Sequence, residues 1–128
     1  MATIPVSPVY ARSANLCTTL AGNVPTTNIA ERGTSLGPAL LRITMADLGA
    51  GQTCTYAIQG SPDGTIWYAI PYADSATSLT VSVATFVLNT EGGVTAYKII
   101  QPNAPARFIR VEMSANTNTN STIDLWVY

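Results

Sequence analysis

The chain has 128 residues, of which only 10% are charged, and a formal net charge of −1; this length suits one domain with a buried core and is too short for two ordinary domains. Six mostly scattered Lys and Arg residues do not form the basic surface of a nucleic-acid-binding protein. No apolar run approaches the ~18 residues that a membrane-spanning helix needs. The first residues lack the pattern of a secretory signal. A surface so poor in charge is weakly protected against association, so we expect a partner to cover part of it.

Residues 1–38 carry the weakest strand pattern in the chain. Only Asn15–Leu20 alternates in the manner of a strand, Thr26–Glu31 could form a single helical turn, and prolines recur at Pro5, Pro8, Pro25 and Pro38. The segment nevertheless carries more apolar residues than disordered tails do. We therefore predict an ordered, extended N-terminal arm with loops. Four of its apolar residues are candidate partner contacts: Ile4, Val6, Val9 and Tyr10.

The clearest local signal is the turn Pro62-Asp63-Gly64. Pro62 fixes the φ angle that the first corner of a type I turn needs, Asp63 can accept hydrogen bonds from nearby backbone, and Gly64 can adopt a positive φ. The preceding run, Thr53–Gln59, alternates polar and apolar residues, and the following run, Thr65–Ile70, is β-branched and aromatic. This pattern predicts a β-hairpin whose role is to build a core.

Five further segments show strand-like patterns, namely Leu41–Met45, Leu79–Val83, Val94–Ile100, Phe108–Met113 and Ile123–Val127. Turn signals separate them, including the polar segment Asn116–Asn120, to which we assign no core capacity. With the hairpin, this gives seven strands in residues 39–128, or eight with one strand from the arm. The sequence therefore predicts an all-β fold: an antiparallel β-sandwich, jelly-roll or immunoglobulin-like, preceded by an extended N-terminal arm over residues 1–38.

Several aromatic residues are expected outside the core. Trp126 and Tyr128 alternate with the apolar residues of the last strand, so they should face away from the core. By the same alternation, Trp67 and Tyr68 must point to opposite faces, which leaves one of them outside. Exposed aromatic residues near a chain end suit a subunit interface at least as well as a sugar platform. Trp126 and Tyr128 therefore join the candidate partner contacts.

The residue types that perform most catalysis and metal binding are scarce. Histidine is absent, which excludes catalytic triads with a histidine base. The cysteines, Cys17 and Cys54, do not cluster as zinc ligands do; we expect both to be reduced and Cys54 to lie in the core. A calcium site at Asp63 or Asp74 stays open, although no Asp-rich loop supports it. We expect no catalytic residues, no metal and no cofactor, and hence no enzyme.

Three segments resemble β-sandwich domains of tailed-bacteriophage virion proteins. They are Tyr56–Tyr68, which contains the turn, Ala106–Val111, and the terminal Ile123–Val127. The likeness covers residues 40–128, and discoidin-like and carbohydrate-binding sandwiches use a similar Ser-Pro-Asp-Gly-x-x-Trp hairpin. The arm carries no motif of a known family.

Among phage proteins of this size, small sandwiches with an extended arm look like capsid decoration, or cement, proteins. The resemblance implies a non-enzymatic virion protein on the outer capsid surface, made in the host cytoplasm. Its implied partners are the major capsid protein and further copies of itself, most often in a trimer, with no nucleic acid and no membrane. The alternatives are a carbohydrate-binding module of a phage tail fibre or adhesin and a tail or neck component.

Overall fold

The computed structural model is all-β. It describes residues 2–6, 13–18, 22–32, 39–46, 51–74, 81–82, 85–90, 96–102, 106–118 and 120–127. Within these residues it contains twelve strands and no helix. Accordingly, no helix of the described chain is long and apolar enough to span a membrane.

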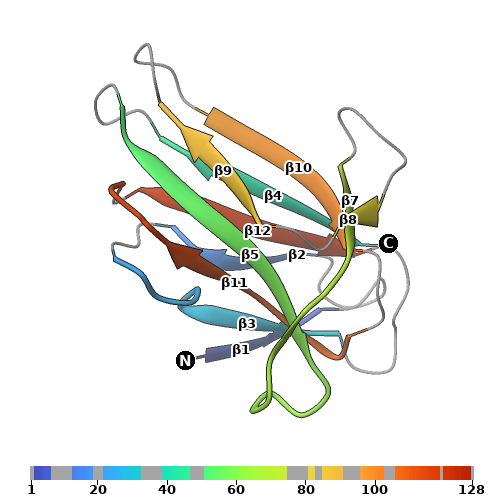
Figure 1. Cartoon of the computed structure of the whole chain (residues 1–128). Helices are drawn as coiled ribbons and strands as arrows, with labels where there is room; N and C mark the ends of the chain where they lie inside the picture. The colour runs from blue at the N-terminus through green and yellow to red at the C-terminus, as the bar shows by residue number, and fades with distance from the viewer. Residues whose placement is uncertain are drawn as a thin grey trace.

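The strands form two six-stranded sheets (Figure 1). The first sheet has the order β1 (Ala2–Pro5), β3 (Asn28–Glu31), β11 (Phe108–Ser114), β5 (Thr53–Ser61) and β6 (Tyr68–Ala69), with β9 (Phe86–Asn89) also paired to β5. The second has the order β2 (Ser13–Cys17), β12 (Ser121–Val127), β4 (Ala39–Met45), β10 (Ala96–Pro102), β7 (Tyr72–Asp74) and β8 (Val81–Ser82). The sheets are mixed, because β1 runs parallel to β3 while the other described pairs are antiparallel.

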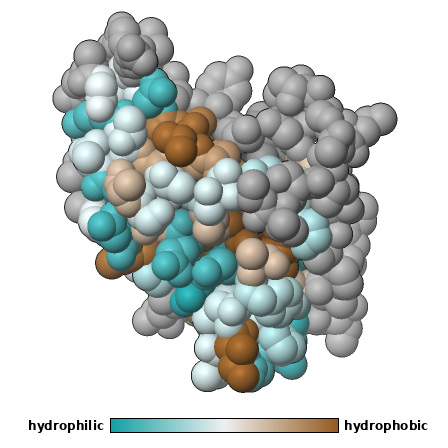
Figure 2. Space-filling model, viewed as in Figure 1, coloured by the Kyte–Doolittle hydropathy of each residue, from teal (hydrophilic) through white to brown (hydrophobic). Residues whose placement is uncertain are grey.

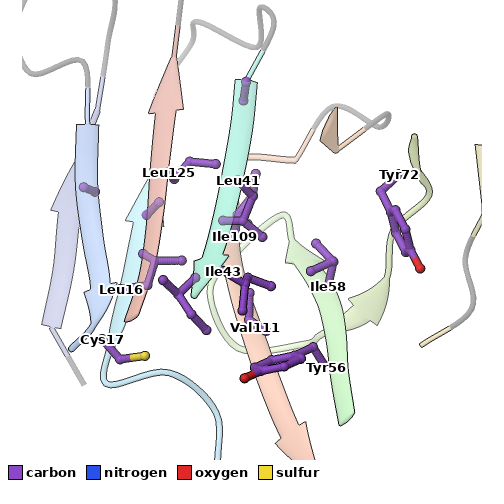
Figure 3. Close-up of a cluster of buried hydrophobic side chains, with 14 of the residues drawn as sticks. Leu16, Cys17, Leu41, Ile43, Tyr56, Ile58, Tyr72, Ile109, Val111 and Leu125 are labelled. Carbon is purple, nitrogen blue, oxygen red and sulfur yellow. The ribbon is translucent and has the colours of Figure 1, made fainter. Parts of the chain in front are cut away.

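The core lies where the inward faces of the two sheets meet (Figure 3). Strict alternation along the long strands supplies it, since every second residue of β4, β5 and β11 is buried. Its fully buried residues, each 0% exposed, include Leu41, Ile43, Ile123 and Leu125 from the second sheet and Tyr56, Ile109 and Val111 from the first. Burying one large apolar side chain of this kind stabilises a fold by about 1.5–3 kcal/mol.

The described parts of residues 1–38 belong to the two sheets and do not form a separate arm. β3 pairs with β11 in the first sheet, and β2 pairs with β12 in the second. Leu16 and Ala30 are 0% exposed. Apolar residues of this segment, from which we predicted that it is ordered, therefore pack into this chain's own core. The helical turn that Thr26–Glu31 could have formed is absent, and Asn28–Glu31 of that stretch is the strand β3. Residues 7–12, 19–21 and 33–38 lie outside the described residues, so the boundary at residue 38 stays a prediction.

The polar segment around Asn118 closes one end of the core. Asn118 is only 1% exposed, and its Nδ2 donates to the carbonyl of Ala46 at 2.9 Å and to Oε1 of Gln52 at 2.8 Å. Thr53 and Thr117 exchange hydrogen bonds beside it. The sequence expectation that this turn has no core capacity fails for Asn118 alone among its described residues, because a buried amide is tolerated when its polar atoms are paired.

Both cysteines are free and buried, as expected for Cys54. Burial raises the pKa of the Cys17 thiol from 9.0 to about 12 and that of Cys54 to about 11. Burial also raises the pKa of the Tyr56 hydroxyl, which lies 2.7 Å from the Ser121 hydroxyl of the other sheet. All three groups therefore stay protonated in the folded state.

These raised pKa values predict that the fold loses stability in alkali. The folded state retains protons that the unfolded state releases, so the stability is fully present below pH 9.0 and falls as the pH rises towards 11–12. At pH 10 the loss should be on the order of 1 kcal/mol per thiol, measured by urea unfolding at pH 7 and pH 10. The double variant Cys17→Ala, Cys54→Ala should lose less between these pH values. An equal loss in both proteins would attribute the alkaline sensitivity to other groups.

Candidate binding surface

The turn of the hairpin between β5 and β6 is the segment Ser61–Tyr68, which runs from the last residue of β5 to the first residue of β6 and which we call the hairpin loop. The Ser61 hydroxyl oxygen accepts hydrogen bonds from the backbone N–H groups of Asp63 at 3.3 Å and Gly64 at 2.8 Å. In turn, Oδ1 of Asp63 accepts from the backbone N–H groups of Thr65 at 2.8 Å and Ile66 at 3.0 Å. The loop backbone is therefore held by side chains of the loop itself.

These bonds explain why the second strand of the hairpin is shorter than its sequence predicts. The run Thr65–Ile70 was expected to be a strand, but β6 comprises only Tyr68–Ala69, after which the N–H of Ile70 donates to the carbonyl of Ile58 in β5 at 3.1 Å. Because the Asp63 carboxylate binds the N–H groups of Thr65 and Ile66, those groups do not join the sheet. The same two bonds, together with the Ser61 hydroxyl, lower the pKa of Asp63, so the exposed carboxylate stays ionised at neutral pH.

Gly64 has a positive φ of 79°, as the turn signal predicted. A Cβ atom at this position would lie 3.8 Å from the ring of Phe108, which is an ordinary contact distance. Space is therefore not the obstacle to a side chain here. The obstacle is the backbone conformation, because L-residues are strained at positive φ.

Trp67 folds back onto the outward face of the first sheet. Its ring lies 4.2 Å from the guanidinium carbon of Arg110, a cation–π contact. Arg110 in turn donates from Nε to Oε1 of Gln59 at 2.8 Å and lies 3.8 Å from a carboxylate oxygen of Glu112. Trp67 is half-buried as a result, and the end of the hairpin loop is attached to β5 and β11.

The residues on either side of Trp67 are exposed apolar side chains. Ile66 is 67% exposed and Tyr68 is 44% exposed. Figure 2 shows hydrophobic surface at the lower end of this face, where Figure 1 places the hairpin between β5 and β6. Neither Trp67 nor Tyr68 enters the core, so the expectation that one of them points inward was wrong: Trp67 precedes β6, and both residues of β6 are exposed. Val87, which is 57% exposed on β9, is a further apolar residue of this sheet.

The outward face of the second sheet carries Trp126. As its alternation predicted, Trp126 is only half-buried, while its neighbour Leu125 is 0% exposed. Its ring lies 4.9 Å from the guanidinium carbon of Arg42. Arg42 also forms an ion pair with Asp124 at 3.2 Å, and Asp124 accepts a hydrogen bond from Asn15 at 2.8 Å. Tyr128, the other aromatic residue predicted for this face, lies outside the described residues.

The candidate contacts in the arm are placed differently from Trp126. Val6 is only 3% exposed and belongs to the core, and Ile4 packs partly buried against it. Little of the Val6 side chain is left for a partner. β1, which carries Ile4, and β12, which carries Trp126, lie in different sheets, so the structure does not join the predicted contacts into one surface. Val9 and Tyr10 lie outside the described residues.

Several charged side chains on the described outward faces are paired within the chain. Three arginines form such ion pairs: Arg42 binds Asp124 at 3.2 Å, Arg107 binds Glu31 at 3.1 Å, and Arg110 approaches Glu112 at 3.8 Å. Exposed pairs of this kind add little stability, about 0–1 kcal/mol each. Their main effect is that these parts of the surface present little net charge.

The surface thus offers apolar contact and hydrogen bonding. In the part of the chain that the structure describes, no three Cys, Asp or Glu side chains lie close enough to hold a metal ion. Comparison with known proteins found no matching family model, no matching curated protein and no matching solved structure. A function must therefore be argued from the residues themselves and from the resemblance of the hairpin segment.

The strained position of Gly64 gives a test of the loop. Gly64→Val should destabilise the protein by about 1–2 kcal/mol, because valine must adopt a positive φ. Chemical unfolding measures this loss. Thr65→Val is the matched control, since it places an isopropyl side chain at the next exposed position without a positive φ. Gly64→Val with the stability of the unmodified protein would contradict the turn assignment.

Proposed function

We propose that this chain is a structural virion protein: a capsid decoration subunit that binds the outer surface of a phage capsid. Two things support the proposal. The segment Tyr56–Tyr68 resembles phage virion β-sandwiches, and it contains the hairpin loop. The observation that carries most weight is that this loop exposes Ile66 and Tyr68 beside Arg107 and Arg110, whose charges are paired within the chain. Protein contacts use such surfaces, with apolar anchors amid little net charge.

For the architecture, we propose an antiparallel β-sandwich of the jelly-roll or immunoglobulin-like class. The shared core and the hydrogen bond between Tyr56 and Ser121 across the sheets support this class. The parallel pairing of β1 with β3 is an addition at one edge of the first sheet.

The proposed mechanism is passive. A subunit that touches two neighbouring capsid proteins buries apolar surface that separation would expose to water. Because the decoration subunit binds only the assembled shell in this way, its binding free energy adds to the stability of the shell. The chain itself forms a closed homotrimer in this proposal, so that one patch serves every copy at a three-fold position.

Binding to shells tests the function directly. Isolated capsid shells of the virus that encodes this chain, stripped of decoration proteins, are mixed with the purified chain and sedimented. We expect saturation at a fixed number of chains per shell and a higher shell melting temperature. Beads coated with the host cell-surface polysaccharide are the second arm. Retention on the beads without binding to shells would overturn the decoration function in favour of a carbohydrate-binding module.

Trp126 tests the proposed self-association. If its half-buried ring lies in the contact between copies, Trp126→Ala should weaken association by about 2 kcal/mol, as loss of an interface hot spot does. Light scattering should then show a shift from trimer towards monomer, while circular dichroism keeps its β signature. Tyr68→Ala is the control, since it removes an exposed aromatic residue of the other sheet. A protein that is monomeric before any substitution would refute the trimer.

A further inference from the structure

The hairpin loop combines a fixed backbone with freely exposed apolar side chains. Oδ1 of Asp63 accepts hydrogen bonds from the backbone N–H groups of Thr65 and Ile66, and Arg110 holds the ring of Trp67. Between these restraints Ile66 is 67% exposed. Isoleucine at such a position contributes nothing to the core of its own chain. A loop already fixed in one conformation loses little entropy on binding, which favours affinity.

We propose that the hairpin loop is a preorganised anchor that inserts Ile66 and Tyr68 into an apolar pocket of a protein partner, with a basic side chain of that partner beside Asp63. This inference rests on the proposed function, because it takes the capsid surface as the partner. It goes further by assigning the contact to the hairpin loop. Neither Ile66 nor Tyr68 was among the contacts that the sequence predicted.

The loop fits a protein pocket better than a sugar. Sugar platforms need an open aromatic face, but one face of the Trp67 ring lies against the Arg110 guanidinium at 4.2 Å. The most exposed large apolar side chain here is Ile66, an aliphatic group that forms no hydrogen bonds. Aliphatic and aromatic side chains that fill a pocket are typical anchors of protein interfaces.

The charges around the loop favour a protein pocket over an anionic membrane or a second copy of the same loop. Asp63 is exposed and ionised, and the nearby Arg107 and Arg110 are occupied by Glu31 and Glu112. An anionic membrane surface would repel Asp63, and these two described arginines would attract it little because they are already paired. A two-fold contact between two copies of the loop would bring two Asp63 carboxylates together. A basic residue at the rim of the partner pocket complements the loop instead.

The test uses the full chain and the stripped capsid shells. Ile66→Ser should raise the dissociation constant about tenfold or more, because an inserted anchor is lost. Val87→Ser is the matched control: it removes a comparably exposed aliphatic side chain from β9, outside the loop. Thermal melting of both variants verifies that they are folded. Equal weakening by both substitutions, or no weakening by Ile66→Ser, would overturn the anchor while the decoration function stands.

Two opposite charges introduced at one position test the proposed basic residue at the rim of the partner pocket. Thr65 is exposed beside Asp63, so Thr65→Lys should weaken binding to shells, whereas Thr65→Glu should preserve or strengthen it, most clearly at low salt. The reverse order would overturn the basic rim. Vesicles of anionic phospholipid serve as a further probe: binding to them with loss in Ile66→Ser would assign the loop to a membrane and refute the protein pocket. Failure of the unmodified chain to bind shells would overturn the proposed function and the anchor together.

Discussion

The structure depends on the contact between the inward faces of its two sheets. Ile43 and Leu125 from the second sheet pack with Val111 and Tyr56 from the first, and all four are 0% exposed. With so few charges and no disulfide among the described cysteines, burial of these apolar faces is the main force that holds the sheets together. The Tyr56–Ser121 hydrogen bond fixes how one sheet lies on the other, because both hydroxyl groups would be left unpaired by a shift.

That core places the candidate binding surface. β5 and β11 pair over seven residue positions, and their inward residues are anchored in the core. Their outward residues therefore form a rigid base on which Arg110 and Gln59 hold Trp67. The hairpin loop is fixed by its own Ser61 and Asp63 at one end and by this base at the other. Exposure of Ile66 is thus a property of an ordered loop.

The edge strands of the sheets are protected against further strand pairing in several ways. Pro5 stands at the end of β1, at one edge of the first sheet, where proline limits further pairing. At the edge of the second sheet, the Asn28 side chain donates to the carbonyl of Asn15 at 3.0 Å and covers part of β2. On β9 the exposed residues, Val87 and Asn89, are both uncharged, so this edge carries less protection against association than the other two.

The sequence shows alternation of apolar and polar residues and the residue types of tight turns. These two patterns determined the all-β class, the long strands, the positive φ of Gly64 and the outward direction of Trp126. These features depend on local rules: a period of two residues and a glycine where φ is positive. Only the tertiary structure decided the rest. Leu16 and Ile4 indicate order, but their sheet partners β12 and β3 are chosen by long-range packing. Thr65 and Ile66 have strand propensity, yet a side-chain bond to Asp63 overrides it. Exposure of Ile66 follows from that competition, which sequence patterning does not resolve.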